Sequence, residues 1–288
     1  MKRALILAAL LALAACAQAP QEPRVMARHV PERADDFVFE NNLVCGRIYG
    51  KALEGNPTSP GVDIWVKLPG TLVANEWYRH FSEEGNESYY HHDHGGKDCY
   101  KVAVSLGGGA SALLVENRIQ YPATNWRSYE ILEEGPEKVA FVLHYPEWQA
   151  EGVTIALDKK ITVTPDTYFF KCEDTYTFNG EGVDSLWMVA GINRHAALET
   201  IETEWNGKDR YAIWEHASDQ SNEPEDGMIG VAVYMPEAET AGMSKGDEHA
   251  IVGRQIVSGQ TVTYYFGSCW SKGDIKSSND WFELVKSL

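Results

Sequence analysis

The amino-acid sequence predicts an all-β fold, a large β-sandwich with one short C-terminal helix. Three observations lead to this prediction. Segments in which apolar and polar residues alternate recur along the chain, and turn-forming pairs such as Pro165-Asp166 and Asn179-Gly180 separate them. No strand–helix–strand rhythm connects the segments, so sheets are expected to pack on sheets.

The predicted strands follow one another from Phe37 to Phe266, and their β-branched and aromatic residues suit a pleated, half-buried surface. In chain order they are Phe37–Phe39, Leu43–Tyr49, Val62–Val66, Tyr100–Ser105, Ala112–Gln120, Tyr129–Leu132, Lys138–Tyr145, Val153–Val163, Tyr168–Phe178, Leu186–Ile192, Tyr211–Trp214, Ile229–Tyr234, Ile251–Val257 and Thr261–Phe266. Only the end of the chain has a helical pattern, because capping side chains from Ser277 to Asp280 precede an apolar stripe that begins at Trp281.

The first residues have the pattern of a secretion signal. Lys2 and Arg3 precede an apolar run from Ala4 to Ala15 that is too short to span a membrane. The run ends LAAC at Cys16, which resembles a bacterial lipobox and implies cleavage before Cys16 and lipid attachment to its thiol. An ordinary signal peptide with a cysteine nearby is the alternative.

Three regions are therefore expected. Residues 1–15 are a lipoprotein signal peptide, residues 16–33 form a flexible tether from the lipidated Cys16, and residues 34–288 form a single β-sandwich domain. The domain is long enough to bury a sizeable core. The expected location is the periplasm or the cell surface, with the lipid in a bacterial membrane, most naturally the outer one.

The charge of the chain restricts its partners. The formal net charge is −17, and removal of residues 1–15 takes away Lys2 and Arg3 but no acid, which gives −19. Such a surface disfavours nucleic acid and anionic lipid headgroups. Contact with a membrane is therefore expected only through the lipid on Cys16, and an acidic ligand would need a local cationic pocket.

Four cysteines remain after Cys16, and they lie far apart without a CxxC pair. A zinc knuckle is therefore disfavoured. One or two disulfides suit an oxidising compartment, and small buried thiols are the equal alternative. The sequence does not choose among pairings of Cys45, Cys99, Cys172 and Cys269.

The stretch YYHHDHGGKD, from Tyr89 to Asp98, is the densest group of titratable residues. It holds His91, His92 and His94, three of the nine histidines, and histidine can move protons or bind a metal near neutral pH. In an extended segment His92 and His94 would share one face. His-x-His supplies two ligands where a closed zinc site needs four, so a catalytic or substrate-binding role is favoured over a metal site or a solvated loop.

Other candidates lie further along the chain. Arg127, which follows Asn125 and Trp126, could bind a carboxylate through two parallel hydrogen bonds, with a surface arginine as the alternative. His195 follows an apolar strand, although a lone histidine is more often structural. The SLGGGAS segment at residues 105–111 matches neither a Walker loop nor a dinucleotide fingerprint, and the chain has no GxSxG elbow.

This combination of histidine, tyrosine and arginine indicates proton abstraction beside a carboxylate. Removal of the C5 proton of a uronic acid needs a base, an acid for the leaving oxygen and a cation for the developing enolate. His94, Tyr100 and Arg127 would supply these parts if the fold brings them into one crevice. A bound Ca²⁺ or Zn²⁺ near His91 and His94 is an alternative electrophile.

Five separated motifs, in order, resemble a bacterial family of secreted proteins catalogued as a domain of unknown function. They are ERADDFVFENNLVCGRIYG from Glu32, NPTSPGVDIWVK from Asn56, YHHDHGGKDCYKV from Tyr90, NWRSYEIL from Asn125 and YYFGSCWSKGD from Tyr264, followed by a DWFELV helix. The resemblance implies a sandwich similar to galactose mutarotase and several polysaccharide lyases. It also implies a place in polysaccharide utilisation and an oligosaccharide dehydratase activity, which leaves a 4,5-unsaturated uronic acid.

The family's YH-x-DHG pattern falls on Tyr90, His91, Asp93 and His94, so His91 and His94 rank above His92. Family members often have an arginine in the glycine-rich loop where this chain has Leu106, which gives more weight to Arg127 and Lys101. The resulting hypothesis needs no cofactor, and its residues and their roles are as follows. His91 or His94 is the base, Tyr100 or His195 the acid, Arg127 the carboxylate ligand, Trp126 and Trp270 the sugar platforms, and Tyr90, Asp93, Asp98 and Lys101 further substrate contacts.

Two other functions stay open on sequence grounds. A glycoside hydrolase or an epimerase could use the same fold and would release a product without a new double bond. A surface lipoprotein that binds glycans without changing them would also suit the lipid anchor and the aromatic residues.

Overall fold

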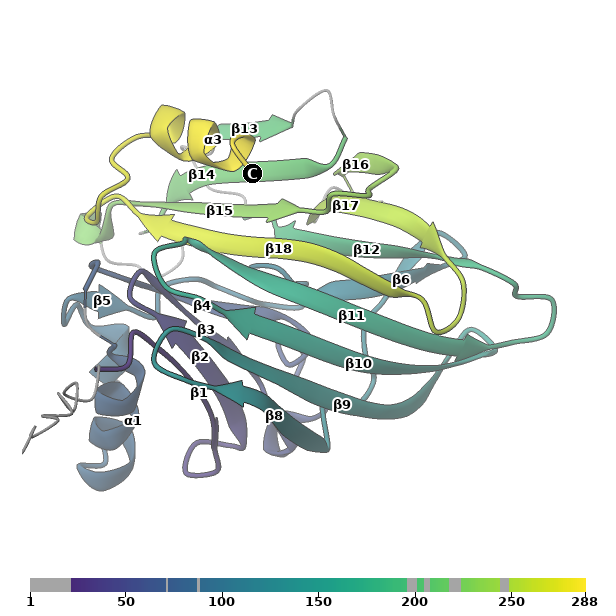
Figure 1. Cartoon of the computed structure of the whole chain (residues 1–288), viewed down its shortest axis with the longest axis horizontal. Coiled ribbons are helices and arrows are strands. Elements are labelled where there is room, and N and C mark those ends of the chain that lie inside the picture. Colours follow the sequence, from purple (N-terminus) through teal and green to yellow (C-terminus); the bar gives the residue numbers. More distant parts are fainter. Residues whose placement is uncertain are drawn as a thin grey trace, which may run out of the picture.

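The structure is a computed structural model, and it describes residues 22–70, 72–86, 89–195, 201–204, 208–217, 224–243 and 249–288. The predicted signal peptide and Cys16 lie outside these residues. Within them the chain folds mostly into β-strands, with two short α-helices (Figure 1). The prediction of an all-β sandwich with a C-terminal helix is confirmed.

The described strands form three sheets, and neighbouring strands pair antiparallel (Figure 1). The first sheet has the order β1 (Val25–Val30), β2 (Asp36–Asn41), β3 (Val44–Ile48), β4 (Val62–Lys67) and β5 (Gly96–Lys97). The second has the order β13 (Ile201–Glu204), β14 (Arg210–His216), β15 (Met228–Tyr234), β18 (Thr261–Trp270), β11 (Phe169–Asn179), β10 (Val153–Val163), β9 (Val139–Ala150) and β8 (Ser128–Glu134). The third has the order β16 (Thr240–Met243), β17 (His249–Ile256), β12 (Leu186–Asn193), β6 (Ser111–Val115) and β7 (Arg118–Gln120).

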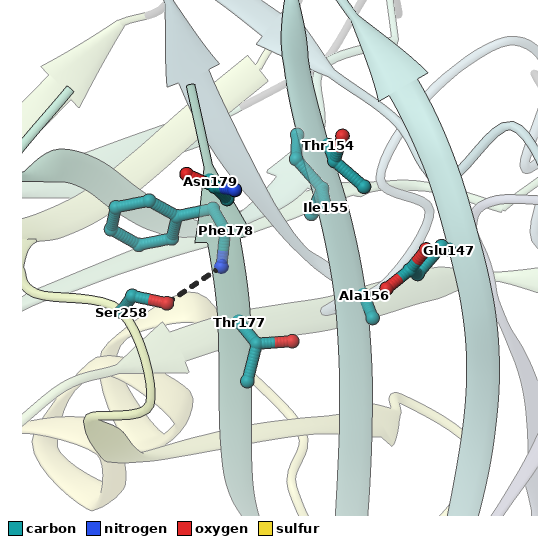
Figure 2. Close-up of a pocket in the computed structure, with 8 residues that line it drawn as sticks. All are labelled: Glu147, Thr154, Ile155, Ala156, Thr177, Phe178, Asn179 and Ser258. Atoms are coloured by element: carbon teal, nitrogen blue, oxygen red, sulfur yellow. Dashed lines mark hydrogen bonds between the residues drawn. The ribbon is translucent and has the colours of Figure 1, made fainter. Parts of the chain in front are cut away.

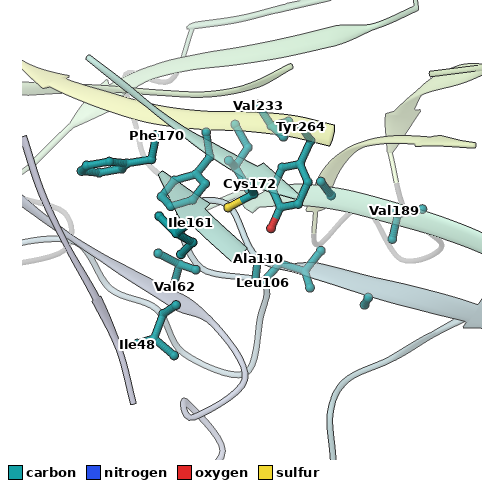
Figure 3. Close-up of a cluster of buried hydrophobic side chains, with 14 of the residues drawn as sticks. Ile48, Val62, Leu106, Ala110, Ile161, Phe170, Cys172, Val189, Val233 and Tyr264 are labelled. Carbon is teal, nitrogen blue, oxygen red and sulfur yellow. The ribbon is translucent and has the colours of Figure 1, made fainter. Parts of the chain in front are cut away.

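The eight-stranded sheet forms one layer, and both five-stranded sheets pack against its inner face. Strands β2 and β4 contact β10 and β18, while β12 and β17 contact β14 and β15. The main core lies between the layers: Ile48 and Val62 of the first sheet meet Ile161 and Phe170 of the second (Figure 3). Alternating residues supply this core because successive side chains of a strand point to opposite faces.

The C-terminal helix α3 (Ser278–Lys286) covers the outer face of the eight-stranded sheet. Its N-terminus is capped by Ser277, whose side-chain oxygen accepts the amide hydrogen of Asp280 at 3.2 Å. Trp281 is fully buried and stacks on Phe169, with ring centroids 5.4 Å apart. Among the helices in the described ranges, none is long and apolar enough to cross a membrane.

A second helix, α1 (Ala74–Glu83), was not expected from the sequence. It covers the outer face of the first sheet, where Trp77 and Tyr78 pack against Trp65. Its N-terminus is capped from another part of the chain: the Glu40 carboxylate accepts the amide hydrogens of Val73 at 2.7 Å and Ala74 at 2.9 Å. A negative charge is favourable at this end of a helix.

Three local predictions are corrected. The tether predicted to reach residue 33 is shorter, because Val25–Val30 already pair with β2. The strand predicted at Tyr100–Ser105 is absent, since this segment crosses irregularly from the first sheet toward the third. The His-rich stretch is not extended either: it contains the 3₁₀ turn η2 (Tyr89–His91) and an Asp93 side chain that accepts the Gly95 amide hydrogen at 3.0 Å.

Glycines let the loop at residues 105–109 pass against two sheets. A Cβ on Gly107 would lie 2.1 Å from the Val62 carbonyl oxygen, and a Cβ on Gly109 would lie 2.2 Å from Phe266. The loop also forms backbone hydrogen bonds with Val62 and Asn193, so it joins strands β4 and β12. The glycines were predicted to let a strand bend beside a pocket, and their observed use is close backbone approach.

The cysteines that the structure describes are free thiols, and Cys45, Cys99, Cys172 and Cys269 are all buried. Of the two alternatives left open by the sequence, the structure has the buried thiols. Burial raises the pKa of each thiol above its usual value, which suppresses the reactive thiolate.

Replacement of Gly107 by alanine is expected to destabilise the fold more than replacement of Gly152. Both have positive φ, +62° and +80°, but a Cβ at Gly152 meets nothing within 4 Å. Gly152→Ala should therefore lose about 1–2 kcal/mol of unfolding free energy from backbone strain alone. Gly107→Ala should lose about 1–3 kcal/mol more from the clash. Urea denaturation measures both values, and equal losses would contradict the close approach.

Candidate functional site

His195 and Glu215 form the most chemically distinctive pair among the described residues. Strand β12 ends at Asn193, two residues before His195, and Glu215 lies in β14. The Nδ1 atom of His195 is 2.7 Å from Oε1 of Glu215, and Nε2 is 2.6 Å from the backbone oxygen of Lys101. The Asn193 side-chain amide nitrogen is 3.1 Å from the same Nε2.

This environment favours the protonated form of His195. The Glu215 carboxylate and the Lys101 oxygen only accept hydrogen bonds, which favours hydrogen on both ring nitrogens of His195, whereas the Asn193 amide nitrogen near Nε2 is itself a donor. Burial alone would lower the pKa of His195, but the hydrogen bond and charge of Glu215 and the bond to Lys101 outweigh it. The pKa is therefore raised, and His195 is suited to donate a proton.

Tyr100 packs against His195 instead of presenting its hydroxyl to solvent. The two rings meet edge to face with centroids 5.1 Å apart. The Tyr100 hydroxyl donates to the backbone oxygen of Gly107 at 2.9 Å, and burial raises its pKa well above the usual value. Tyr100 was one of two predicted acids, and in the structure its hydroxyl is buried and already donates to a backbone oxygen.

His91 differs from His195 in that its side chain is more exposed and its pKa is lowered. Its side chain is 53% exposed, and Nδ1 lies 3.3 Å from the backbone oxygen of Asp98. Burial of part of the ring lowers the pKa of His91, and the nearby positive charge of Arg47 lowers it further. The hydrogen bond to the Asp98 backbone opposes this lowering. With Nδ1–H donated to the carbonyl, Nε2 is left with a lone pair that can accept a proton.

The Asp98 side chain belongs to a buried charged cluster below His91. Arg47 lies among the carboxylates of Asp36, Asp63 and Asp98, with Nη2 at 3.0 Å from Asp98 Oδ2, and its guanidinium lies over Tyr90. Burial and the charge of Asp63 raise the pKa of Asp98 to about 8, against the opposing effect of Arg47. Asp98 and Tyr90 are therefore structural supports under His91, not the exposed substrate contacts predicted.

His94 and Asp93 lie on the surface next to α1. His94 stacks on Tyr89 with centroids 3.9 Å apart, and Tyr89 stacks on His80 at 3.8 Å. Asp93 pairs with Lys272, whose Nζ is 2.8 Å from Oδ2. His94 is therefore an exposed imidazole whose ring face is occupied by Tyr89.

His91 and His195 are tied to one short piece of chain. Their ring nitrogens face the carbonyl oxygens of Asp98 and Lys101 respectively. An extended chain advances at most about 3.6 Å per residue, so these two carbonyl groups are within roughly 11 Å of each other. One short segment thus carries a backbone contact of one imidazole of lowered pKa and of one of raised pKa, and a base and an acid differ in this way.

Arg127 lies level with the start of β18, whereas the histidine-rich segment lies near the end of that strand. Its amide donates to the His144 oxygen of β9, and the cross-strand pairs through β10 and β11 lead from there to Thr261, the first residue of β18. Trp270 ends β18 at a rise of roughly 30 Å from Thr261, beside the Lys272 that contacts Asp93. In Figure 1 the arrowhead of β18 lies on the same side as α1 and β5.

The predicted crevice shared by His94 and Arg127 is therefore corrected. The Arg127 guanidinium instead pairs with Glu54 and donates to the Asn125 backbone oxygen at 2.7 Å. The two predicted sugar platforms are also corrected. Trp126 packs against Phe37 and is 5% exposed, while Trp270 is 2% exposed and donates from Nε1 to the Asp226 backbone oxygen at 2.6 Å.

Sequence reasoning missed Glu215, although a signal for it exists. The residue lies in the apolar strand YAIWEH, where an unpaired charge would be costly, so a partner was to be expected.

No group of three or more histidine, cysteine or acidic side chains converges on a metal position within the described ranges.

Comparison with known proteins gives the family. The sequence profile of a family described as "Domain of unknown function (DUF4861)" matches residues 12–288. The chain belongs to the DUF4861 family. A curated relative, "Uncharacterized protein P7" of Formosa agariphila, is 29% identical over 261 residues, which cover 85% of this chain and 62% of that protein. This DUF4861 chain thus spans less than two thirds of that relative's length.

Two solved structures are similar to this DUF4861 protein at low level. The 4-alpha-glucanotransferase from Thermococcus litoralis has a TM-score of 0.34 and 11% identity, with 86% of this chain and 40% of that chain covered. The GH36 alpha-galactosidase AgaB from Geobacillus stearothermophilus has a TM-score of 0.34 and 8% identity, with 85% and 41% covered.

The pKa of His195 in this DUF4861 protein should depend on Glu215. With the pKa raised in the folded state, His195 contributes stability that is complete below its ordinary pKa of about 6.5 and is lost as pH rises through the folded value. In Glu215→Gln the opposing effect of burial remains, so the pKa should fall and this stability should disappear. NMR titration of the imidazole and urea denaturation across neutral pH measure both effects. The same titration curve in both proteins would contradict the pairing.

Proposed function

We propose that the protein is a carbohydrate-active enzyme that eliminates water from a terminal uronic acid of an oligosaccharide and leaves a 4,5-unsaturated sugar. The observation that carries the proposal is the pair of imidazoles held by the segment from Asp98 to Lys101, one of lowered and one of raised pKa. β-Elimination needs such a base and acid. The family likeness implied by the sequence motifs supplies the substrate class.

In the proposed reaction His91 is the base and His195 the acid. Nε2 of His91 takes the proton from C5 of the uronic acid, and the electrons of that C–H bond form the C4–C5 double bond. The C4–O bond breaks, and His195 gives its Nε2 proton to the departing oxygen, which leaves as water. The Glu215 carboxylate stabilises the imidazolium before the transfer and keeps the ring oriented.

Lys101 is proposed as the cation for the substrate carboxylate, in the role first given to Arg127. Its backbone oxygen accepts from His195, so its side chain starts from the centre of the proposed site, and it is exposed. A positive charge near the carboxylate stabilises the enolate that develops when the C5 proton leaves. Against the net charge of −17, such a local cation is required for an acidic oligosaccharide to bind.

The proposal places the enzyme outside the cytoplasm, in the periplasm or at the cell surface. The lipobox-like end of the signal sequence at Cys16 supports a lipid anchor in a bacterial membrane. An anchored enzyme of this kind would act on fragments of polysaccharides before their uptake.

Replacement of either imidazole should abolish most turnover. Loss of a positioned acid or base typically lowers the rate by about 10²–10⁴. We therefore expect His91→Gln and His195→Gln each to lower kcat in this range, measured by the ultraviolet absorbance of the new double bond on uronic-acid-terminated oligosaccharides. His144→Gln is a matched control, because His144 also pairs with a carboxylate, Asp158 at 2.7 Å, but lies in the middle of β9, level with the start of β18 and not with Trp270 at its end.

Three outcomes would contradict the proposed site or the proposed reaction. Full turnover in both His91→Gln and His195→Gln would reject the site. A shortened oligosaccharide without the absorbance change would indicate a hydrolase. Saturable binding with the oligosaccharide recovered unaltered would indicate a glycan-binding protein.

The pH profile of kcat/KM should be bell-shaped around neutrality. The base His91 is active when neutral, so activity should fall as pH drops below its lowered pKa. The acid His195 is active when protonated, so activity should fall as pH rises above its raised pKa. The ordinary pKa of histidine is about 6.5. The midpoint of the acidic limb should therefore lie below this pH, and the midpoint of the alkaline limb should lie above it. Glu215→Gln should move the alkaline limb to lower pH, and a limb that stays in place would exclude His195 as the acid.

A further inference from the structure

A polar hollow lies on the outer face of the eight-stranded sheet, far from the two imidazoles. It holds about 440 Å³ of space between atoms, part of which is open to solvent. Its lining comes from three adjacent strands and one turn: Glu147 of β9, Thr154, Ile155 and Ala156 of β10, Thr177, Phe178 and Asn179 of β11, and Ser258 (Figure 2).

The hollow has two structural causes. Ile155 pairs with Trp148 and Leu157 pairs with Tyr145, so two residues of β9, including Glu147, oppose the single residue Ala156. Such a bulge bends the strand and redirects a side chain, and bulges are common beside binding sites. Ala156 also has only a methyl group on this face, so the sheet surface is depressed at this position.

The groups around the depression are suited to hydrogen bonding with a ligand. Thr154 accepts from the Gln149 amide at 2.7 Å, and Ser258 accepts from the Phe178 backbone amide at 2.8 Å, so both hydroxyl hydrogens are left to donate. Within the described part of the chain, the side chains of Thr177 and Asn179 have no hydrogen-bond partner. Because β10 and β11 are interior strands of the sheet, they hold these groups rigidly.

The charge of the hollow selects among ligands. Glu147 is the one ionisable side chain among its lining residues. Together with the net charge of −17, this carboxylate disfavours an acidic ligand. Hydroxyl and amide groups that both donate and accept match a neutral polyhydroxyl compound.

We propose that this hollow binds a neutral saccharide unit, as a second carbohydrate site separate from the imidazole site. Cross-strand pairing puts Ala156 opposite Thr177, which lies beyond the part of β11 that pairs with the start of β18. The hollow is thus at the end of the sheet opposite Trp270 and the histidines. The proposal does not depend on the elimination chemistry.

Titration with cellotetraose, xylotetraose and mannotetraose tests the proposal, with the backbone amide NMR signals of Thr177 and Asn179 as reporters. At least one of these neutral probes should saturate the signals at millimolar concentration. Asn179→Ala should weaken binding roughly tenfold through a lost hydrogen bond, and Ala156→Leu, which fills the hollow, should abolish it. Thr175→Ala is the matched control, because Thr175 is on the same face but bonds to Thr261 at 2.7 Å, outside the lining.

Several results would overturn the proposal. The first is that none of the neutral probes binds saturably. The second is that binding persists in Ala156→Leu while the unfolding midpoint of that variant is unchanged. The third is that tetragalacturonate binds more tightly than the neutral probes at the same amides. His195→Gln should bind the neutral probe as the parent does, and loss of binding in that variant would place the saccharide at the imidazole site instead. Failure of elimination and failure of this site are therefore distinguishable.

Discussion

The close backbone approach at Gly107 is the constraint on which the rest of the structure depends. No side chain larger than hydrogen fits between this residue and Val62, so the loop can lie against β4. There its carbonyl oxygen accepts from both the Tyr100 hydroxyl and the Asn193 amide. The same contact that joins two sheets thus positions the ring beside His195 and the end of the strand that precedes it. In physical terms, the fold and the proposed site share one set of hydrogen bonds.

Much of the fold could be predicted because strand alternation is a local property of the sequence. The parts that were missed depend on distant partners. Helix α1 lacks a capping side chain of its own, and Glu40, which supplies the cap, is remote in sequence. Likewise β1 looks like a polar linker until it pairs with β2. The His-rich stretch looked extended, but the bond from Gly95 to Asp93 turns it after η2.

The sequence predicted which types of residue the proposed site would contain, but it predicted their positions in the fold only in part. A single irregular segment carries the backbone contacts of both His91 and His195, at Asp98 and Lys101 respectively. Arg127 is excluded for a reason that alternation does not reveal: several strand pairings decide at which end of a long sheet a residue lies. Burial explains why Trp126 does not serve as a sugar platform. Its indole ring is of a type that stacks on sugars, but the side chain is buried in the core.

The four buried thiols have a consequence for how the protein responds to oxidants. Fixed in separate parts of the interior, with Cys45 under α1 and Cys269 under α3, they do not meet one another in the native state. The described part of the fold therefore stands without disulfide bonds among these four cysteines, and it gives an oxidant little thiolate to attack. Vulnerability is confined to the interval before folding is complete, when the sulfur atoms are open to mispairing. Packing of the two layers and their helices against each other is thus what shields these thiols from oxidants.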